Sequence, residues 1–269
     1  MILDTHSHLN FAAYKKDLAE VIKRTQESDV VCINVGTKYE TSLEAIKLAE
    51  ENKGMYAAIG LHPLFVLSEF MKVRTDPDEG EFLVKEQDFN IEKYKELAKS
   101  KKVVAIGEIG LDYYYRPKTK AKLEQFKEKQ KQVFLRQLDF ARDLDLPMII
   151  HCRMAHEDLI KILDYQKGVI HCFTGGVEEM EQYLNLGFYI GLNGIIFKMD
   201  LDEVIKKCPL ESILVETDCP YLTPPEQGDK RNEPIFIKHI IQKIADLKGV
   251  SFEEVAEKTI QNAQKLFGI

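Results

Sequence analysis

The first residues of the chain combine an apolar run with side chains that commonly bind metal ions. The run Met1-Ile2-Leu3-Asp4-Thr5-His6-Ser7-His8 places a carboxylate and two imidazoles at alternate positions. Alternate side chains of a strand point to one face, so we expect Asp4, His6 and His8 to lie together. Two imidazoles on one face can bind one side of a metal ion. The pattern also suits an edge strand whose polar residues face water, and the spacing alone leaves both interpretations open.

Histidine and carboxylate side chains also stand at or near the ends of several later apolar runs. These residues are His62, Glu108, His151, His171 and Asp218. A buried carboxylate is costly unless it is paired or bound to metal, which draws attention to Glu108 and Asp218 inside their apolar surroundings. Together with the first two histidines, this set exceeds what one ion needs. The sequence therefore predicts a site for two divalent metal ions.

The predicted ligands form two groups that share one carboxylate. The ligands of the first ion are His6, His8, Glu108 and Asp218. Those of the second ion are His151, His171 and the bridging Glu108. Two ions about 3.5–4 Å apart can share a hydroxide and stabilise both oxygens of an in-line displacement. We predict that Asp218 orients or deprotonates the attacking water and that Glu108 is catalytic as well. Asp4 is expected either to support a ligand or to pack under the site.

Three further residues are candidates for contact with the substrate. His62 precedes Pro63, so its backbone is extended and its side chain can reach the site, and we count it among the catalytic residues too. Arg153 lies two residues after His151 and can bind a phosphate through two parallel hydrogen bonds. Arg231 lies shortly before Pro234, where a helix start would attract anions. A capped helix start with solvated charges is the alternative interpretation of that segment.

Apolar, β-rich runs alternate along the chain with segments of helical periodicity, and near-continuous apolar runs indicate strands covered on both faces. The predicted strands are Ile2–His8, Val30–Gly36, Met55–His62, Val103–Leu111, Pro147–Arg153, Gly168–Phe173, Tyr189–Ile195 and Ile213–Asp218. The predicted helices are Tyr14–Glu27, Tyr39–Asn52, Ile91–Ser100, Lys120–Leu144, Glu157–Tyr165, Val177–Leu186, Leu201–Lys207, Pro234–Lys248 and Phe252–Phe267. This alternation predicts a (β/α)8 TIM barrel, whose sites lie at the carboxyl ends of the strands. An open doubly wound sheet is the second choice, but no G-x-G-x-x-G follows an early strand.

Length and composition suit one α/β domain. The 269 residues, 45% apolar and 30% charged, are expected to form a single hydrolase domain over residues 1–269. No apolar run approaches the ~20 residues that cross a bilayer, and no basic leader precedes the first run, so we expect a cytoplasmic protein without membrane contact or an obligate protein partner. Cys152, Cys172 and Cys219 each follow a predicted site residue and are expected to face away from it as packing residues.

Charge and one irregular segment complete the picture. The net charge of −7 argues against a protein that coats long nucleic acids, because such proteins usually carry a basic surplus. A polyanion would have to be held by a local basic patch or by metal ions, through few phosphates. Residues Phe65–Gln87 show little periodicity, and we interpret them as an excursion after the third strand, either a lid or a solvated insertion.

Several segments together resemble one enzyme family. They are Asp4-Thr5-His6-Ser7-His8, Gly60-Leu61-His62-Pro63, Gly107-Glu108-Ile109-Gly110-Leu111-Asp112, His151-Cys152-Arg153, His171-Cys172-Phe173-Thr174-Gly175, Glu216-Thr217-Asp218-Cys219-Pro220-Tyr221-Leu222 and Arg231-Asn232-Glu233-Pro234. In this order they resemble the TatD family of metal-dependent deoxyribonucleases. The resemblance implies a metallo-dependent hydrolase barrel that cleaves DNA phosphodiester bonds, typically from a 3′ end, with Mg²⁺ commonly used. Imidazole ligands suit Mn²⁺, Zn²⁺ or Ni²⁺ better, so the metal identity stays open.

Two other functions compete with this one. An amide or ester hydrolase of the amidohydrolase kind would usually bridge its metals with a modified lysine on strand four, where this chain offers Glu108 and no lysine. A non-catalytic nucleic-acid-binding protein would need basic residues interleaved with aromatic ones, and Tyr113-Tyr114-Tyr115-Arg116 is one such cluster. That cluster could stack a terminal base or simply pack beside the rim. A complete set of water-activating ligands would have no purpose in a pure binder.

Overall fold

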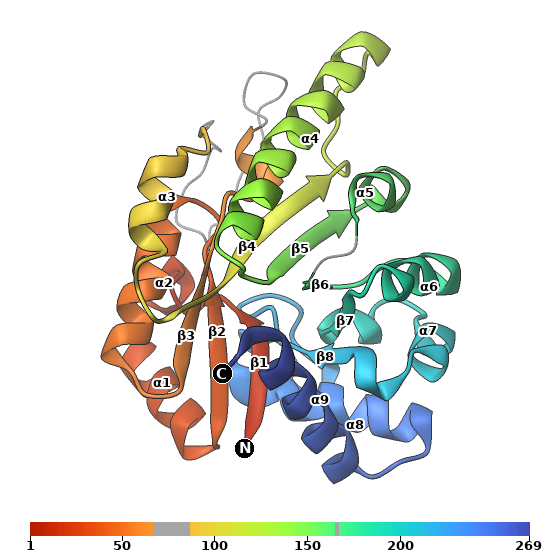
Figure 1. The fold of residues 1–269 in the computed structure, drawn as a ribbon. Helices are drawn as coiled ribbons and strands as arrows, with labels where there is room; N and C mark the ends of the chain where they lie inside the picture. The colour runs from red at the N-terminus through yellow and green to blue at the C-terminus, as the bar shows by residue number, and fades with distance from the viewer. Residues whose placement is uncertain (67–86, 165–166) are drawn as a thin grey trace.

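Eight parallel strands form the centre of the molecule, which is a computed structural model that describes residues 1–66, 87–164 and 167–269 (Figure 1). The strands are β1 Ile2–Ser7, β2 Val30–Val35, β3 Met55–Ile59, β4 Val103–Asp112, β5 Met148–Arg153, β6 Gly168–Ile170, β7 Tyr189–Leu192 and β8 Ile213–Val215. Each pairs with its sequence neighbour, and a parallel bridge between Ser7 of β1 and Cys219, which follows β8, joins the two ends of the sheet. The sheet therefore closes into the predicted TIM barrel.

Helices connect the strands and cover the outside of the barrel (Figure 1). The α-helices are α1 Leu18–Glu27, α2 Tyr39–Glu51, α3 Ile91–Leu97, α4 Lys120–Asp143, α5 His156–Ile162, α6 Val177–Asn185, α7 Asp202–Lys207, α8 Ile237–Lys248 and α9 Phe252–Phe267. Short 3₁₀ helices are η1 Ala12–Tyr14, η2 Pro63–Val66, η4 Gly194–Phe197, η5 Leu210–Ser212, η6 Pro225–Gln227 and η7 Pro234–Phe236. No helix in the described ranges combines the length and the apolarity that a membrane crossing requires.

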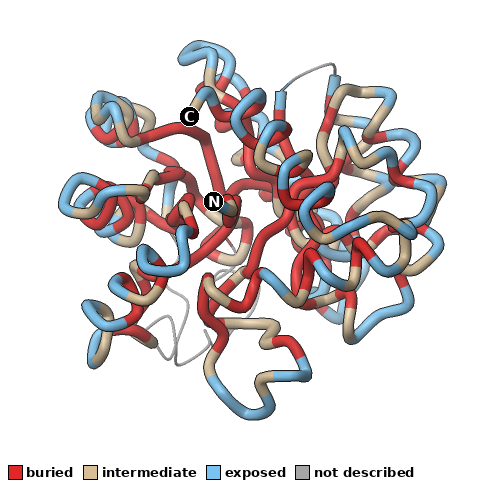
Figure 2. Tube along the Cα trace, turned by 90° about the horizontal axis from the view of Figure 1, so that it is seen from below, coloured by how far each residue is buried: buried red, intermediate tan, exposed pale blue. Residues whose placement is uncertain are grey.

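Two apolar clusters account for the double covering of the strands. One lies between the strands and the surrounding helices and includes Cys32, Ile59 and Ile150. The other fills the barrel interior, with Leu3, Ile33, Ala58, Ile149, Val169 and Leu214 from different strands. Leu266 and Phe267 of α9 pack against this second cluster, so the last helix closes the amino end of the barrel. Seen from below, the buried trace runs through the centre and the exposed segments surround it (Figure 2).

Local sequence explains where the closing helix α9 starts and stops. The Ser251 hydroxyl accepts a hydrogen bond from the Glu254 backbone N–H at 3.1 Å, which satisfies one of the free donors of the first turn. Glu253 and Glu254 also place negative charge at that positive end. Gly268 follows the last turn with φ +69°, a left-handed conformation that glycine adopts without a steric penalty.

A register shift in β1 corrects the prediction that Asp4, His6 and His8 share one face. Asp4 pairs with Cys32 of the outer cluster, and the register then shifts before Ser7 pairs with Asn34. The extra residue reverses the alternation, so His6 and His8 reach the site while Asp4 stays on the outer side. There its carboxylate accepts hydrogen bonds from the Thr217 hydroxyl at 2.5 Å and the Thr217 N–H at 2.9 Å.

Several elements end earlier than their apolar patterns suggest. β3, β6 and β8 stop at Ile59, Ile170 and Val215, so the polar residues predicted at their ends follow the strands. Beyond the ends of these strands, the segments that follow them no longer pair with the neighbouring strands. Asp218 lies in such a segment and has φ +54°. The predicted helices Tyr14–Glu27 and Pro234–Lys248 each begin with a separate 3₁₀ turn. Residues 67–86 of the predicted excursion, and with them any lid, lie outside the described residues. The predicted helix Glu157–Tyr165 stops at Ile162, three residues early, and Tyr165 itself lies outside the described residues.

Candidate functional site

A cavity of about 400 Å³ opens at the carboxyl ends of the strands. Its lining includes most of the site residues predicted from sequence: His8, His62, Glu108, His151, Arg153, His171 and Asp218. His6 is fully buried and lies against them, with its ring stacked on that of His171 at 3.7 Å. The barrel thus brings side chains from β1, β4 and β5, and from the segments after β3, β6 and β8, to one place.

Four of these side chains converge on a small volume. The Nε2 atoms of His6 and His8 lie 3.0 Å apart. Oε2 of Glu108 lies 3.5 Å from the first nitrogen and 3.9 Å from the second. Oδ1 of Asp218 lies 3.7 Å and 3.4 Å from the same two atoms. These are the four residues that the sequence predicts as ligands of one ion.

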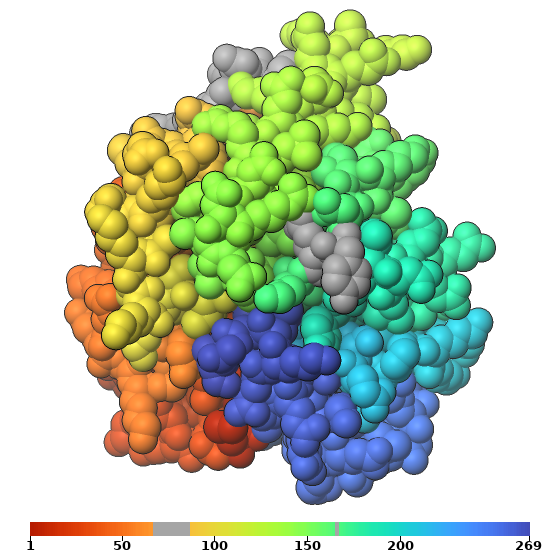
Figure 3. Space-filling view, in the orientation of Figure 1, coloured from red at the N-terminus to blue at the C-terminus, as the bar shows by residue number. Residues whose placement is uncertain are grey.

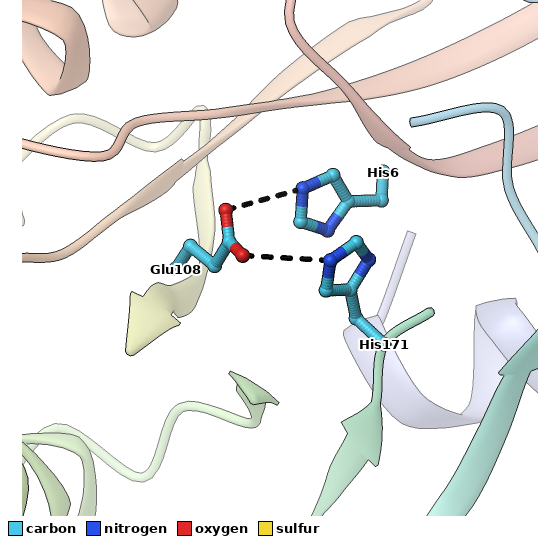
Figure 4. A group of neighbouring side chains, drawn as sticks. All are labelled: His6, Glu108 and His171. Carbon is cyan, nitrogen blue, oxygen red and sulfur yellow. Dashed lines mark ion pairs between the residues drawn. The ribbon is translucent and has the colours of Figure 1, made fainter. Parts of the chain in front are cut away.

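The second oxygen of Glu108 faces a different group. Oε1 lies 2.8 Å from Nδ1 of His151 and 3.4 Å from Nε2 of His171. Figure 4 shows the two carboxylate oxygens directed at separate imidazoles, His6 and His171. Nε2 of His62 also lies 3.4 Å from Oε1, so His62 is as close to this carboxylate as the predicted ligand His171 is.

The donor atoms fit a divalent cation. Ligands about 2.0–2.1 Å from a tetrahedral ion lie roughly 3.3–3.4 Å from one another, which falls inside the range of 3.0 to 3.9 Å between the donor atoms of the first group. Nδ1 of His8 lies 2.8 Å from the Val35 carbonyl, so it carries the proton and Nε2 presents a lone pair. Nδ1 of His6 is buried and has no hydrogen-bond partner among the described residues. Without a cation, the two Nε2 atoms can share one proton in a hydrogen bond; with a cation between them, both would present lone pairs to it and the His6 proton would move to Nδ1.

Charge in the site favours the anionic form of both carboxylates. Burial alone raises the pKa of Glu108, but His62, His151 and His171 outweigh it and hold that pKa well below its usual range. Burial likewise raises the pKa of Asp218, and the nearby His8 more than compensates. For His6, burial and the neighbouring His171 lower the pKa, which favours the neutral ring that a metal requires.

The sequence-based site prediction missed two carboxylates, Glu216 and Asp112. Glu216 is buried behind His171 and accepts hydrogen bonds from His171 Nδ1 at 2.9 Å, from the Cys172 N–H at 2.7 Å and from the Asn193 amide at 3.0 Å. It therefore fixes the tautomer that directs Nε2 of His171 into the site. The available signal was its position two residues before Asp218, on the same face of the predicted strand Ile213–Asp218.

Asp112 is the second missed carboxylate, and it lines the cavity. Its Oδ2 lies 3.2 Å from Nε2 of His151, whose other ring nitrogen faces Glu108. Burial lowers the pKa of His151, but the bonds to Asp112 and Glu108 outweigh it and raise that pKa to about 9. Asp112 closes the motif that begins at Gly107, so a second acidic residue in that motif was the signal.

The three cysteines predicted to pack away from the site do not all do so. Cys152 and Cys219 are buried, as expected of packing residues. Cys152 also contributes to the cavity lining, but its Sγ lies 3.3 Å from Nδ1 of His156 on α5. Cys172 is only partly buried and lines the cavity beside His171, contrary to the expectation that it faces away. The strand ends at Ile170 and Cys172 turns with φ +45°, so strand alternation no longer applies to it.

The two predicted arginines lie in different surroundings. Arg153 lines the cavity and its guanidinium stacks on the ring of Tyr114, 3.6 Å from the ring centroid. Arg231 is not among the described lining residues, and its guanidinium binds both oxygens of Asp17 at 3.0 and 2.7 Å and the Ala13 carbonyl at 2.6 Å. This network disfavours the prediction that Arg231 binds substrate, which stays untested.

Comparison with known proteins places this barrel among known enzymes. The family model described as TatD related DNase matches residues 3–268. This chain belongs to the TatD-related DNase family. The resemblance of its motifs is therefore confirmed over nearly the whole length, together with the TIM barrel of a metal-dependent hydrolase that acts on phosphodiester bonds of DNA.

TatD-family relatives match from end to end. The uncharacterized metal-dependent hydrolase YabD of Bacillus subtilis (strain 168) is 38% identical over 278 residues, with 100% of each chain covered. The 3′-5′ ssDNA/RNA exonuclease TatD of Yersinia pseudotuberculosis is 33% identical over 281 residues, with 99% of each covered. The crystal structure of YjjV, a TatD homologue from Escherichia coli K12, superposes with a TM-score of 0.83 at 29% identity, covering 100% of this chain and 98% of that one. The amidohydrolase alternative gains no better support.

Proposed function

We propose that this chain removes nucleotides from the 3′ end of single-stranded DNA, using two divalent ions. The proposed ligands of the first ion are His6, His8, Glu108 and Asp218, and those of the second are Glu108, His151 and His171. The observation that carries the proposal is the Glu108 carboxylate, whose two oxygens face two separate imidazole groups beneath one cavity. The name of the Yersinia relative, an exonuclease acting on single-stranded DNA and RNA, supports the proposed direction and substrate.

Bound divalent ions would polarise the phosphate and lower the pKa of a water molecule so that it can attack at neutral pH. The chain's own residues would orient the reacting groups. Asp218 lies at the cavity surface as an anion and can accept the proton of the attacking water. Arg153 stands at the mouth with an exposed guanidinium that can pair with a phosphate.

His62 is suited to donate a hydrogen bond in its neutral form. Its Nδ1 accepts a hydrogen bond from the Leu64 N–H at 3.0 Å, so the ring proton lies on Nε2, which points into the site. Burial lowers the pKa of His62, which favours this neutral tautomer. The ring can thus donate to a phosphate oxygen or to the departing 3′ oxygen without first being charged.

The size of the cavity supports action at an end. About 400 Å³ lies near the lower limit of the ~300–1,000 Å³ that small-ligand sites occupy. A single nucleotide suits that space better than a continuous duplex, so the 3′-terminal nucleotide of a DNA strand would enter the cavity. Metal identity is proposed as Mg²⁺ or Mn²⁺, with Zn²⁺ or Ni²⁺ as the ions that imidazole ligands also favour.

The proposal is tested by turnover of a single-stranded oligonucleotide with Mg²⁺ or Mn²⁺, with and without EDTA. Wild type should release mononucleotides in metal, and both EDTA and Glu108→Ala should abolish release. Glu253→Ala, which removes an exposed carboxylate on α9, is the matched control and should cut as wild type does. Activity that survives both EDTA and Glu108→Ala would overturn the mechanism.

The end-directed part has its own test. A 3′-phosphate-blocked oligonucleotide is compared with one that has a free 3′ hydroxyl, in DNA and in RNA. We expect the blocked DNA to be cut much more slowly. Equal cutting in the middle of both strands would refute the exonuclease assignment while leaving a nuclease in place.

A further inference from the structure

Two exposed aromatic side chains stand beside the cavity mouth. Tyr114 is 51% exposed and Tyr115 is 39% exposed, and within the described ranges they are the aromatic members of the exposed large apolar residues. Their rings meet edge to face with centroids 5.0 Å apart. The Arg153 guanidinium lies 3.6 Å from the centroid of Tyr114 and 6.0 Å from that of Tyr115. Both Arg153 and Tyr115 line the cavity, so this cluster continues its wall outward.

The barrel holds the base of this cluster in place. The Tyr113 N–H donates to the Arg153 carbonyl at 2.8 Å, which ties the start of the loop to the end of β5. The Tyr114 N–H donates to Oδ1 of Asp112 at 2.8 Å, and the other oxygen of Asp112 contacts His151. The exposed rings therefore begin two residues beyond Asp112, a carboxylate of the site. Neighbouring exposed apolar groups beside a cavity are typical of a binding surface.

Positive charge gathers on the next stretch of chain. Residues 113–131 carry seven Lys and Arg residues and two Glu residues, a net charge of +5, whereas the whole chain carries −7. Lys127 and Lys131 pair with Asp158 of α5. The more exposed members have no ion-pair partner among the described residues; they are Arg116, Lys118, Lys120 and Lys122. Arg116 and Lys118 lie on the loop before α4, and Lys120 and Lys122 lie on its first turn. The start of α4 rises above the carboxyl ends of β4 and β5 and protrudes from the molecule (Figures 1 and 3).

We infer that Tyr114, Tyr115 and Arg153, with the basic start of α4, bind the single strand that leads away from the cavity. Aromatic rings next to a basic path are the combination that binds unpaired nucleic acid, because every base has a stackable face and every linkage has a charge. A strand whose 3′ nucleotide fills the cavity would lay its preceding bases on the rings and its phosphates along Arg116, Lys118 and the lysines beyond. Duplex DNA hides its base faces, so the surface selects unpaired ends. This inference rests on the proposed function, since it assigns the strand's path from the same cavity.

Stacking is tested by binding of a hydrolysis-resistant phosphorothioate dT12 that carries a 5′ fluorophore, followed by anisotropy in Mn²⁺. Tyr114→Ala should weaken binding about tenfold, which corresponds to ~1.4 kcal/mol. Leu43→Ala, which truncates an exposed apolar residue of α2, should bind as wild type does. Abasic sites placed second to fourth from the 3′ end should weaken wild-type binding but add little to the loss in Tyr114→Ala, because the stacking partner is already gone.

Charge is tested by the salt dependence of the same binding. Lys118→Glu/Lys120→Glu/Lys122→Glu should reduce the slope of log affinity against log salt by about two, since each lost phosphate contact to a single strand removes about 0.7. The matched control reverses three exposed lysines at the amino end of the barrel: Lys101→Glu/Lys207→Glu/Lys265→Glu. It has the same net charge and should keep the wild-type slope.

The outcomes separate this inference from the proposed function. If wild type cuts single-stranded DNA but Tyr114→Ala and the α4 triple variant bind dT12 as tightly as wild type, the binding surface is wrong and the nuclease stands. The inference would also be overturned if Lys118→Glu/Lys120→Glu/Lys122→Glu and its control, Lys101→Glu/Lys207→Glu/Lys265→Glu, lost the same affinity for dT12. Equal losses of affinity would reflect net charge alone. If wild type neither cuts nor binds, the proposed function itself fails. Unchanged thermal midpoints of all variants show that the losses do not come from unfolding.

Discussion

Replacing Glu216 by Gln should weaken metal binding at His171 without dismantling the barrel. Glu216 is fully buried, and its Oε1 accepts hydrogen bonds from His171, Cys172 and Asn193. A glutamine has the same shape and its amide oxygen can accept from the same three donors. What it loses is the negative charge that makes the imidazole a stronger base.

The expected size of the effect follows from these contacts. Losing a carboxylate that supports a metal-binding histidine typically costs 10–100-fold in metal affinity, or ~1.4–2.7 kcal/mol. Oε2 is buried and has no partner among the described residues, so a glutamine N–H₂ placed there stays unsatisfied and lowers the free energy of unfolding by about 1–3 kcal/mol. Glu216→Ala would instead leave all three donors of the pocket unpaired, at about 1–3 kcal/mol each, and is a poor probe because it unfolds the surroundings.

The assay is turnover of single-stranded DNA as a function of Mn²⁺ concentration, beside calorimetric titration of the metal. Glu216→Gln should need 10–100-fold more metal for half-maximal rate, and saturating metal should restore most of the rate, because a positioning residue acts only through His171. Glu211→Gln, on the exposed turn before β8, is the matched control and should not shift the curve. A wild-type metal curve for Glu216→Gln would refute the assigned role, and a rate that excess metal cannot restore would make Glu216 a participant in the chemistry.

Three further predictions test other parts of the molecule. His171→Ala should reduce the bound metal from two ions to one per chain, as measured by elemental analysis after dialysis, and retention of both would remove His171 from the ligand set. Arg231→Ala should reduce the dependence of the free energy of unfolding on pH at acid pH, because Arg231 lowers the pKa of Asp17 in the folded state. The pair stabilises the fold above the unfolded pKa of about 3.9, and this contribution is lost as pH falls through the lower folded pKa. Denaturant unfolding at pH 7 and pH 3 measures this, and parallel losses at both would contradict it. Gly110→Ala should destabilise the fold by about 3 kcal/mol or more, because Gly110 has φ +142° and a Cβ there would lie 2.0 Å from the His151 carbonyl oxygen. Thermal unfolding measures this, and a midpoint close to that of wild type would show that the strand can shift to make room.

The barrel was predictable because its strands are covered on both faces. Runs such as Ile213–Val215 stay apolar at consecutive positions, and that continuity marks parallel strands better than any single residue does. The convergence of distant ligands followed from the same inference, since all carboxyl ends of a barrel meet at one rim. His62, Glu108 and His171 needed no further information to be brought together.

What the sequence could not supply was irregularity. The shift in β1 that separates Asp4 from His6 depends on how a neighbouring strand pairs, and alternation within one strand carries no trace of it. The partner of Arg231 lies on a segment more than two hundred residues earlier, so a helix start with a nearby arginine looked like an anion site. Glu216 stands out in the sequence as an acidic residue in an apolar run. Its role depends on its hydrogen bond to His171, which follows β6 whereas Glu216 follows β8, and the sequence does not show that contact.

The two ions proposed here would not bind independently. One Glu108 oxygen faces each group of imidazoles, so the first cation to arrive fixes the carboxylate's orientation and leaves the other oxygen aimed at the second group. The ordering cost would then be met once rather than twice, which favours the second ion by linkage and opposes the repulsion between two cations so close together. When the ordering contribution exceeds that repulsion, stepwise titration gives a sigmoidal curve, and scarcity of metal switches off the whole population of enzyme over a narrow concentration range.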